Sequence, residues 1–87
     1  MTYRAVLSRR AEKAFLDLPI EQAKRVKEAI RGLELEPRGQ ATIKLDYAPV
    51  AQYRCRVGNL RILFDIDDGD RIVEILDIRK RDEQTYR

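Results

Sequence analysis

Histidine and tryptophan are both absent from this 87-residue sequence, and cysteine occurs only once. Without histidine, the chain lacks the usual general base and the commonest neutral metal ligand. We therefore expect no zinc cluster, no catalysis by a serine–histidine or cysteine–histidine pair, and no metal ion or cofactor. The single thiol, Cys55, cannot form a disulfide within the chain, which fits a reducing compartment. Because it lies in an alternating apolar stretch, we interpret Cys55 as a small buried hydrophobe.

Long apolar runs are also missing. No stretch approaches the ~20 residues of a membrane span, and no signal peptide opens the chain, so we expect a cytoplasmic protein without membrane contacts. Charged residues make up 38% of the chain and apolar residues 44%, which indicates a folded domain with a heavily charged surface. The length predicts one domain over residues 1–87, and the net charge of +3 points weakly to polyanionic partners.

The N-terminal half predicts a short strand over residues 3–7 and then two helices. Ser8 is placed to cap the first helix, and Pro19 lies at a first-turn position of the second. Pro37 ends the second helix, and the short connection predicts an antiparallel helix pair. Each helix has one apolar face, formed by Ala11, Ala14, Phe15 and Leu18 in the first and by Ala23, Val26, Ile30 and Leu33 in the second.

The C-terminal half alternates with a period of two, which is typical of strands. Residues 37–52 are looser: "TIKL" is compatible with a few extended residues, and we interpret the rest as loop. Gly58-Asn59 and Gly69 then supply the turns of two successive hairpins. Their strands are "YRCRV", "LRILFDI" and "RIVEILDI". The order of elements predicts an α+β fold: an N-terminal strand, an antiparallel helix pair, then a three-stranded antiparallel meander, with the helices on one face of a single twisted sheet.

The first hairpin sorts its side chains by face. A two-residue turn pairs Arg56 with Arg61, and cross-strand partners point to the same face. Arg54 shares that face because it lies two residues from Arg56. Like charges placed directly opposite are destabilising, so the pair predicts an anion nearby. The opposite face is apolar and consists of Cys55, Val57, Leu60, Ile62, Phe64 and Ile66.

The last strand offers a choice of face. Ile72, Leu76 and Ile78 share one parity with Glu74, and we predict that this set faces the core. Arg79 and Arg81 would then join Arg61 on the far side from the helices. The same topology predicts that these arginines lie at one end of the sheet, and that the other end holds Asp65, Asp67, Asp68 and Asp70.

Simpler interpretations stand beside a phosphate site. Arg54 and Arg56 are also compatible with a merely soluble surface, and the "RKR" run with a solvated strand exit. Tyr86 is placed either to pack the tail on the sheet or to stack on an unpaired base. We interpret the basic helix surface as solvated; its cations are Arg9, Arg10, Lys13, Lys24, Arg25 and Lys27.

Along its whole length, the sequence resembles the RelE/ParE superfamily of bacterial and archaeal toxins from toxin–antitoxin pairs. The stretch "SRRAEKAFLDLP" resembles the family's first helix. The stretch "YRCRVGNLRILFDID" resembles its characteristic strands, which lead to a closing strand and an end with basic residues and a tyrosine. The resemblance implies the fold predicted above, but the same scaffold serves two unlike functions.

The RelE branch implies ribosome-dependent cleavage of mRNA, in which a 2′-hydroxyl attacks the adjacent phosphate without a metal ion. By resemblance, Arg61 grips the scissile phosphate, and Arg81 stabilises charge or protonates the leaving group. Tyr86 matches the tyrosine that stacks on a substrate base. Arg54 and Arg56 match two basic residues that are lysines in the best-known members. The candidate catalytic residues are therefore Arg61, Arg81, Arg56 and Tyr86, and the candidate RNA-binding residues are Arg54, Arg79 and Lys80.

The general base stays unassigned in this hypothesis. A guanidinium is effectively always protonated, so Arg56 is a poor base, and catalysis would depend mainly on electrostatic stabilisation and alignment of the RNA. The expected partners are a RelB-like antitoxin in a hetero-oligomer, the ribosome and mRNA. The antitoxin would lay a helix or extended segment over the basic face and the helix pair. The alternatives are a ParE-like, non-enzymatic poison of DNA gyrase and an inactive scaffold that only binds its partner.

Overall fold

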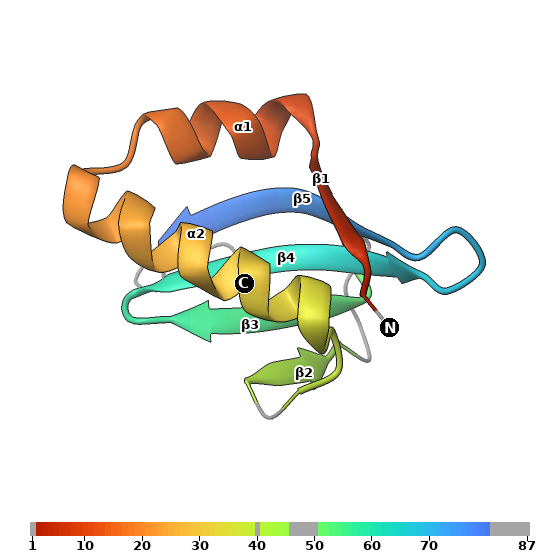
Figure 1. Cartoon of the computed structure of the whole chain (residues 1–87). Coiled ribbons are helices and arrows are strands. Elements are labelled where there is room, and N and C mark those ends of the chain that lie inside the picture. Colours follow the sequence, from red (N-terminus) through yellow and green to blue (C-terminus); the bar gives the residue numbers. More distant parts are fainter. Residues whose placement is uncertain (1, 40, 46–50, 81–87) are drawn as a thin grey trace.

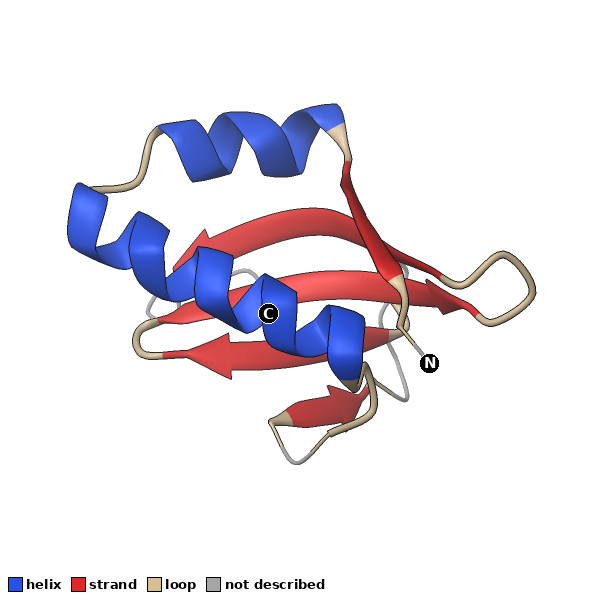
Figure 2. Cartoon of the chain, in the orientation of Figure 1, coloured by secondary structure: helices blue, strands red, loops and turns tan. Residues whose placement is uncertain are grey.

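The structure, a computed structural model, describes residues 2–39, 41–45 and 51–80. Its strands form one mixed sheet in the order β1-β5-β4-β3-β2, in which β1 lies parallel to β5 and the other neighbours are antiparallel. Both helices pack on one face of this sheet (Figures 1 and 2), which confirms the α+β prediction. The elements are β1 (Arg4–Leu7), α1 (Arg9–Leu16), α2 (Ile20–Leu35), β2 (Thr42–Lys44), β3 (Tyr53–Val57), β4 (Leu60–Asp67) and β5 (Ile72–Lys80).

Ser8 joins β1 to α1 and also fixes α1 to the sheet. Its hydroxyl oxygen accepts a hydrogen bond from the Ala11 amide at 3.1 Å and donates one to the Leu76 carbonyl at 2.9 Å. The first contact satisfies an amide that the first helical turn leaves unpaired. The second holds the start of α1 beside β5. The predicted N-cap is confirmed, and it has this additional tertiary role.

The second helix begins after Pro19, which is the N-cap residue, and ends at Leu35, two residues before Pro37. It also covers the sheet edge formed by β1. The Glu34 carboxylate accepts a hydrogen bond from the Ala5 amide at 2.8 Å, and the Glu34 carbonyl accepts one from the Tyr3 amide at 2.7 Å. Edge strands carry unpaired amides that invite association with other chains. Here α2 satisfies two amides at or beside that edge.

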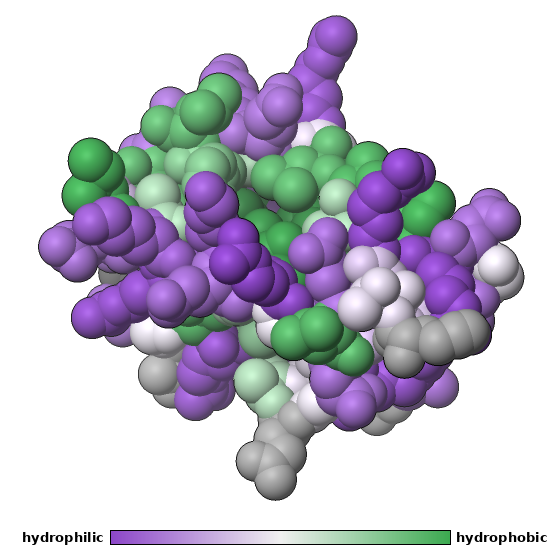
Figure 3. Space-filling model, in the orientation of Figure 1, coloured by the Kyte–Doolittle hydropathy of each residue, from purple (hydrophilic) through white to green (hydrophobic). Residues whose placement is uncertain are grey.

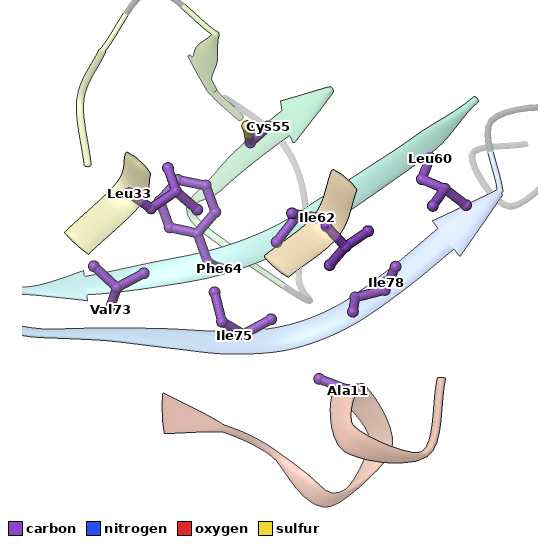
Figure 4. Packing of buried hydrophobic residues seen from close by; sticks show 10 residues of the cluster. Ala11, Leu33, Cys55, Leu60, Ile62, Phe64, Val73, Ile75 and Ile78 are labelled. Atoms are coloured by element: carbon purple, nitrogen blue, oxygen red, sulfur yellow. The ribbon is translucent and has the colours of Figure 1, made fainter. Parts of the chain in front are cut away.

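The core lies between the helices and the inner face of the sheet. In Figure 4, Phe64 of β4 and Ile75 of β5 lie between Leu33 of α2 and Ala11 of α1. Phe64 is fully buried at its centre and stacks on Tyr53 of β3 with 5.7 Å between ring centroids. Cys55 is buried, as predicted, and burial raises the pKa of its thiol.

The first half of β5 contradicts the predicted face. Val73 and Ile75 are fully buried, whereas Glu74 is exposed. The prediction had placed Glu74 on the core side with Ile72 and Leu76, and that assignment is wrong for Glu74 and for Ile72, which lies opposite Asp67 on the outer face. The correction also removes the cost of directing a carboxylate toward the core.

The cause is an irregularity in the pairing of β4 with β5. Leu63 lies opposite Asp77, but the next residue of β4, Phe64, lies opposite Ile75. Leu76 is therefore an extra residue on β5, as in a β-bulge, and such an insertion reverses the alternation of faces along the strand. Beyond it, Ile78 is buried in the core and Arg79 points to the outer face, as predicted.

The helix-covered side of the molecule is largely hydrophilic with separate apolar patches (Figure 3). Two large apolar side chains, Leu16 and Ile20, lie at the corner between the helices and are each 73% exposed. Leu35, at the end of α2, is 64% exposed. These side chains give the helix pair apolar surface that the described core does not use.

Candidate functional site

Three arginines lie directly opposite one another on three adjacent strands. Arg56 of β3 faces Arg61 of β4, and Arg61 faces Arg79 of β5. We call these three residues the arginine row. Their positions alternate with the core residues of each strand, so the row lies on the outer face of the sheet, away from the helices. Neighbouring strands are about 5 Å apart, which brings three positive charges together.

The row combines one exposed and two half-buried side chains. Arg56 is exposed, while Arg61 and Arg79 are of intermediate burial. The β3–β4 turn next to the row requires a glycine, because Gly58 has a positive φ of 58°. The guanidinium of Arg25 in α2 lies within 3.6 Å of the position that a Gly58 Cβ would occupy. Arg25, which we interpreted as solvated surface, thus adds positive charge at this end of the sheet.

A second cross-strand line runs beside the row. It consists of Arg54 on β3, Leu63 on β4 and Asp77 on β5. Asp77 is only 6% exposed, and one of its carboxylate oxygens, Oδ2, accepts a hydrogen bond from Arg79 Nε at 2.8 Å. Sequence reasoning did not select Asp77 as a functional residue. The signal was its spacing of two residues from Arg79, which places both side chains on one face of a strand.

The structure brings together only part of the predicted site. Arg54, Arg56, Arg61 and Arg79 share the outer face. Lys80 lies at the same end of the sheet, but it is opposite Leu60 and therefore has the parity of the core side. Arg81 and Tyr86 lie outside the described residues.

The opposite end of the sheet is acidic, as predicted. The β4–β5 turn holds Asp68, which accepts two hydrogen bonds from Arg38, at 3.0 and 2.9 Å, and one from the Tyr3 hydroxyl at 2.6 Å. These bonds lower the pKa of Asp68 to about 2. The guanidinium carbon of Arg38 also lies 5.6 Å from the ring centre of Tyr53. We call Tyr3, Arg38 and Asp68 the Asp68 cluster, and its contacts are structural.

Comparison with known families gives a match over nearly the whole chain. Residues 5–85 match the family described as ParE toxin of type II toxin-antitoxin system, parDE. The chain belongs to the RelE/ParE toxin superfamily. Comparison with curated protein sequences finds no significant match.

Solved structures of RelE toxins share the fold of this toxin. The archaeal RelE–RelB complex from Pyrococcus horikoshii OT3 has a chain that is 30% identical, with a TM-score of 0.80, covering 95% of this chain and 99% of that one. A chain of the toxin–antitoxin complex RelBE2 from Mycobacterium tuberculosis is 27% identical, with a TM-score of 0.82. This match covers 93% of our chain and 100% of that one. Isolated RelE from E. coli is 20% identical, with a TM-score of 0.78, and the match covers 95% of this chain and 88% of that one. At this low identity the similarity supports the fold alone.

Two further findings concern the described part of this toxin. Its histidine, cysteine, aspartate and glutamate side chains form no group of three or more that could hold a metal ion. Neither described helix is long and apolar enough to cross a membrane.

Proposed function

We propose that this toxin is a ribosome-dependent mRNA endonuclease that inhibits translation. The observation that supports this most strongly is the arginine row on the outer face of the sheet. Like charges placed directly opposite one another cost stability, and an anion bound between them removes that cost. A phosphodiester of RNA is an anion of suitable size, and a guanidinium donates two parallel hydrogen bonds to phosphate oxygens.

In the proposed reaction, the 2′-hydroxyl loses its proton to solvent water and attacks the adjacent phosphate, the bond to the 5′-oxygen of the next nucleotide breaks, and a 2′,3′-cyclic phosphate is left. Negative charge accumulates on the phosphate oxygens in the transition state. Arg61, at the centre of the row, binds that phosphate, while Arg56 and Arg79 stabilise the added charge from either side. Arg81 would protonate the leaving oxygen or stabilise its charge, and Tyr86 would stack on a base.

The flanking cations extend the path of the RNA. Arg54 lies on the same face as the row, two residues before Arg56 on β3. Lys80 lies at the same end of the sheet, but on the other face. Neither is placed to share the central phosphate. We assign both to neighbouring phosphates of the RNA, where they contribute affinity that falls with salt. Alignment of the RNA by the ribosome supplies the remaining part of the catalysis.

We also propose that an antitoxin similar to RelB neutralises this toxin in a hetero-oligomer. Two of the similar structures are complexes of RelE-type toxins with their antitoxins. The exposed side chains of Leu16, Ile20 and Leu35 offer apolar contacts along the helix pair. An amphipathic antitoxin helix fits such a surface, and an adjoining extended segment would cover the arginine row.

The competing function is poisoning of DNA gyrase without catalysis, and the match of residues 5–85 to the ParE family favours it. One experiment separates the two functions. Purified toxin is added to ribosomes programmed with mRNA and, in parallel, to gyrase with supercoiled DNA. We expect RNA breaks at fixed codon positions and no trapped DNA cleavage. Trapped DNA breaks with intact mRNA would favour the gyrase function, and no effect in either assay would favour an inactive scaffold.

A further inference from the structure

Asp77 is the one carboxylate that the described strands place next to the arginine row on the outer face. Its side chain is anchored at both oxygens. Oδ2 accepts the hydrogen bond from Arg79 Nε at 2.8 Å, and Oδ1 accepts one from the Ile78 amide at 2.8 Å. The side chains of Asp77 and Arg79 are 9% and 19% exposed, so this ion pair is shielded from water to an extent that surface pairs are not.

The bond to Arg79 fixes that side chain in a particular way. A contact at Nε holds the inner edge of the guanidinium and leaves the two terminal nitrogens as the groups that reach beyond Asp77. A free arginine side chain populates many rotamers, and ordering it on binding costs about 0.5–1.5 kcal/mol. An arginine that is already held avoids most of that cost and donates from a fixed position.

We propose that Asp77 is a positioning residue, which orients Arg79 so that its guanidinium is directed into the arginine row beside Arg61. The inference rests on the proposed endonuclease function, and it adds to that function a residue that acts through Arg79 and does not touch the RNA. The β-bulge at Leu76 is part of this device, because it brings Asp77 and Arg79 to the outer face together. Without the extra residue, both side chains would lie on the core side.

Asp77 is not placed to act as the general base that the site otherwise lacks. Both of its oxygens already accept hydrogen bonds, and the residue is only 6% exposed. A base must come within about 2.6–3.2 Å of the hydroxyl that it deprotonates. Asp77 also borders a depression of about 540 Å³, which is lined in addition by Arg9, Arg10, Lys13, Ala14 and Asp17.

The first test measures the position of Arg79 directly and needs no catalytic activity. The ¹⁵N order parameter of Arg79 Nε–H is compared in the wild type, Asp77→Ala and the matched control Glu74→Ala. Glu74 is an exposed carboxylate on the same strand, so its loss changes the net charge equally. We expect a rigid Nε–H, near 0.85, in the wild type and the control, and a value below about 0.6 in Asp77→Ala. An Nε–H that is equally mobile in all three proteins would overturn the proposal.

The second test is a double-mutant cycle on the rate of mRNA cleavage in programmed ribosomes. Asp77→Ala should lower the single-turnover rate about 10- to 100-fold, a size typical of a misplaced catalytic group. Asp77→Asn keeps an oxygen acceptor and should retain most of the rate. In an Arg79→Ala background, neither substitution should lower the rate further, because Asp77 acts through Arg79. Glu74→Ala should cleave at the wild-type rate.

Three outcomes contradict the positioning role. If Asp77→Asn loses as much activity as Asp77→Ala and the loss persists without Arg79, Asp77 acts directly on the RNA. If Asp77→Ala cleaves faster than the wild type, the ion pair restrains Arg79 from the substrate. If Asp77→Ala cleaves at the wild-type rate, Arg79 needs no positioning. A wild-type toxin that does not cleave mRNA refutes the endonuclease function instead, and the order parameter still decides whether Asp77 holds Arg79.

Discussion

Charged residues at the two ends of the sheet differ in the sign of the charge that faces them. In the Asp68 cluster, the carboxylate accepts hydrogen bonds from Arg38 and the Tyr3 hydroxyl. In the arginine row, charges of the same sign face one another. The first arrangement ties the N-terminal segment and the region after α2 to the β4–β5 turn. The second brings three like charges together on one face, with Asp77 bound to Arg79 beside them, and we associate it with function.

The low pKa of Asp68 predicts how its contribution to stability depends on pH. The pKa is about 2 in the folded toxin, below the ordinary value of about 3.8 that the group keeps in the unfolded chain. A carboxylate whose pKa falls on folding stabilises the fold above the unfolded pKa, and the effect is lost as pH falls through the folded pKa. The wild type should therefore melt above Asp68→Asn at pH 7, and the gap should close between about pH 4 and 2. Thermal unfolding followed by circular dichroism measures the gap; a constant gap would contradict the assignment.

At the scale of elements, β5 determines how the site is built. It contributes Val73 and Ile75 to the core before the bulge, and Asp77 and Arg79 to the outer face after it. A strand with regular alternation would have given all four residues the same face. The extra residue, Leu76, lets one strand serve the core and the candidate site in turn.

The corrected face of β5 predicts opposite consequences for adjacent residues. Ile75→Ala removes a fully buried side chain and should lower the free energy of unfolding by about 2–5 kcal/mol. Glu74→Ala should change it by no more than about 0.5 kcal/mol, because Glu74 is exposed and faces Asp65 across the strands. Urea unfolding of both variants measures the difference. Equal losses would mean that the strand does not have the described register.

The cap of α1 makes a second prediction at this scale. Ser8→Ala removes both hydrogen bonds of the hydroxyl and should cost about 1–2 kcal/mol of unfolding free energy. Ser8→Thr keeps the hydroxyl and serves as the control. Urea unfolding again provides the measurement, and a stability of Ser8→Ala within error of the wild type would show that the cap contributes nothing.

Local patterns were sufficient to predict most elements and part of the candidate site. Local residue types mark the cap of α1 at Ser8, the end of α2 before Pro37, and the β3–β4 turn at Gly58-Asn59. The facing pair of Arg56 and Arg61 followed from the length of that turn alone. The bulge in β5 was missed, because one alternation was assumed for the whole strand, although Glu74 on the predicted core side marked a change of face. The parallel pairing of β1 with β5 was also not predicted, since it joins segments that are far apart in the chain.

Across the whole molecule, the charges of the sheet are sorted toward opposite ends. Arginines from β3, β4, β5 and α2 gather near the β3–β4 turn, whereas aspartates gather at the β4–β5 turn. Such a distribution steers a polyanion toward one end of a small protein, although the net charge is only +3. The central claim is that the arginine row at the basic end binds the phosphate that is cleaved.

The most direct test of this claim is the single-turnover rate of mRNA cleavage in programmed ribosomes by Arg61→Ala. Arg31→Ala, an exposed arginine of α2, is the matched control, because it removes the same charge on the other side of the sheet. We predict a rate about 10²–10³-fold below that of the wild type for Arg61→Ala, in a protein that stays folded, and a wild-type rate for the control. Cleavage by Arg61→Ala at the wild-type rate would contradict the account.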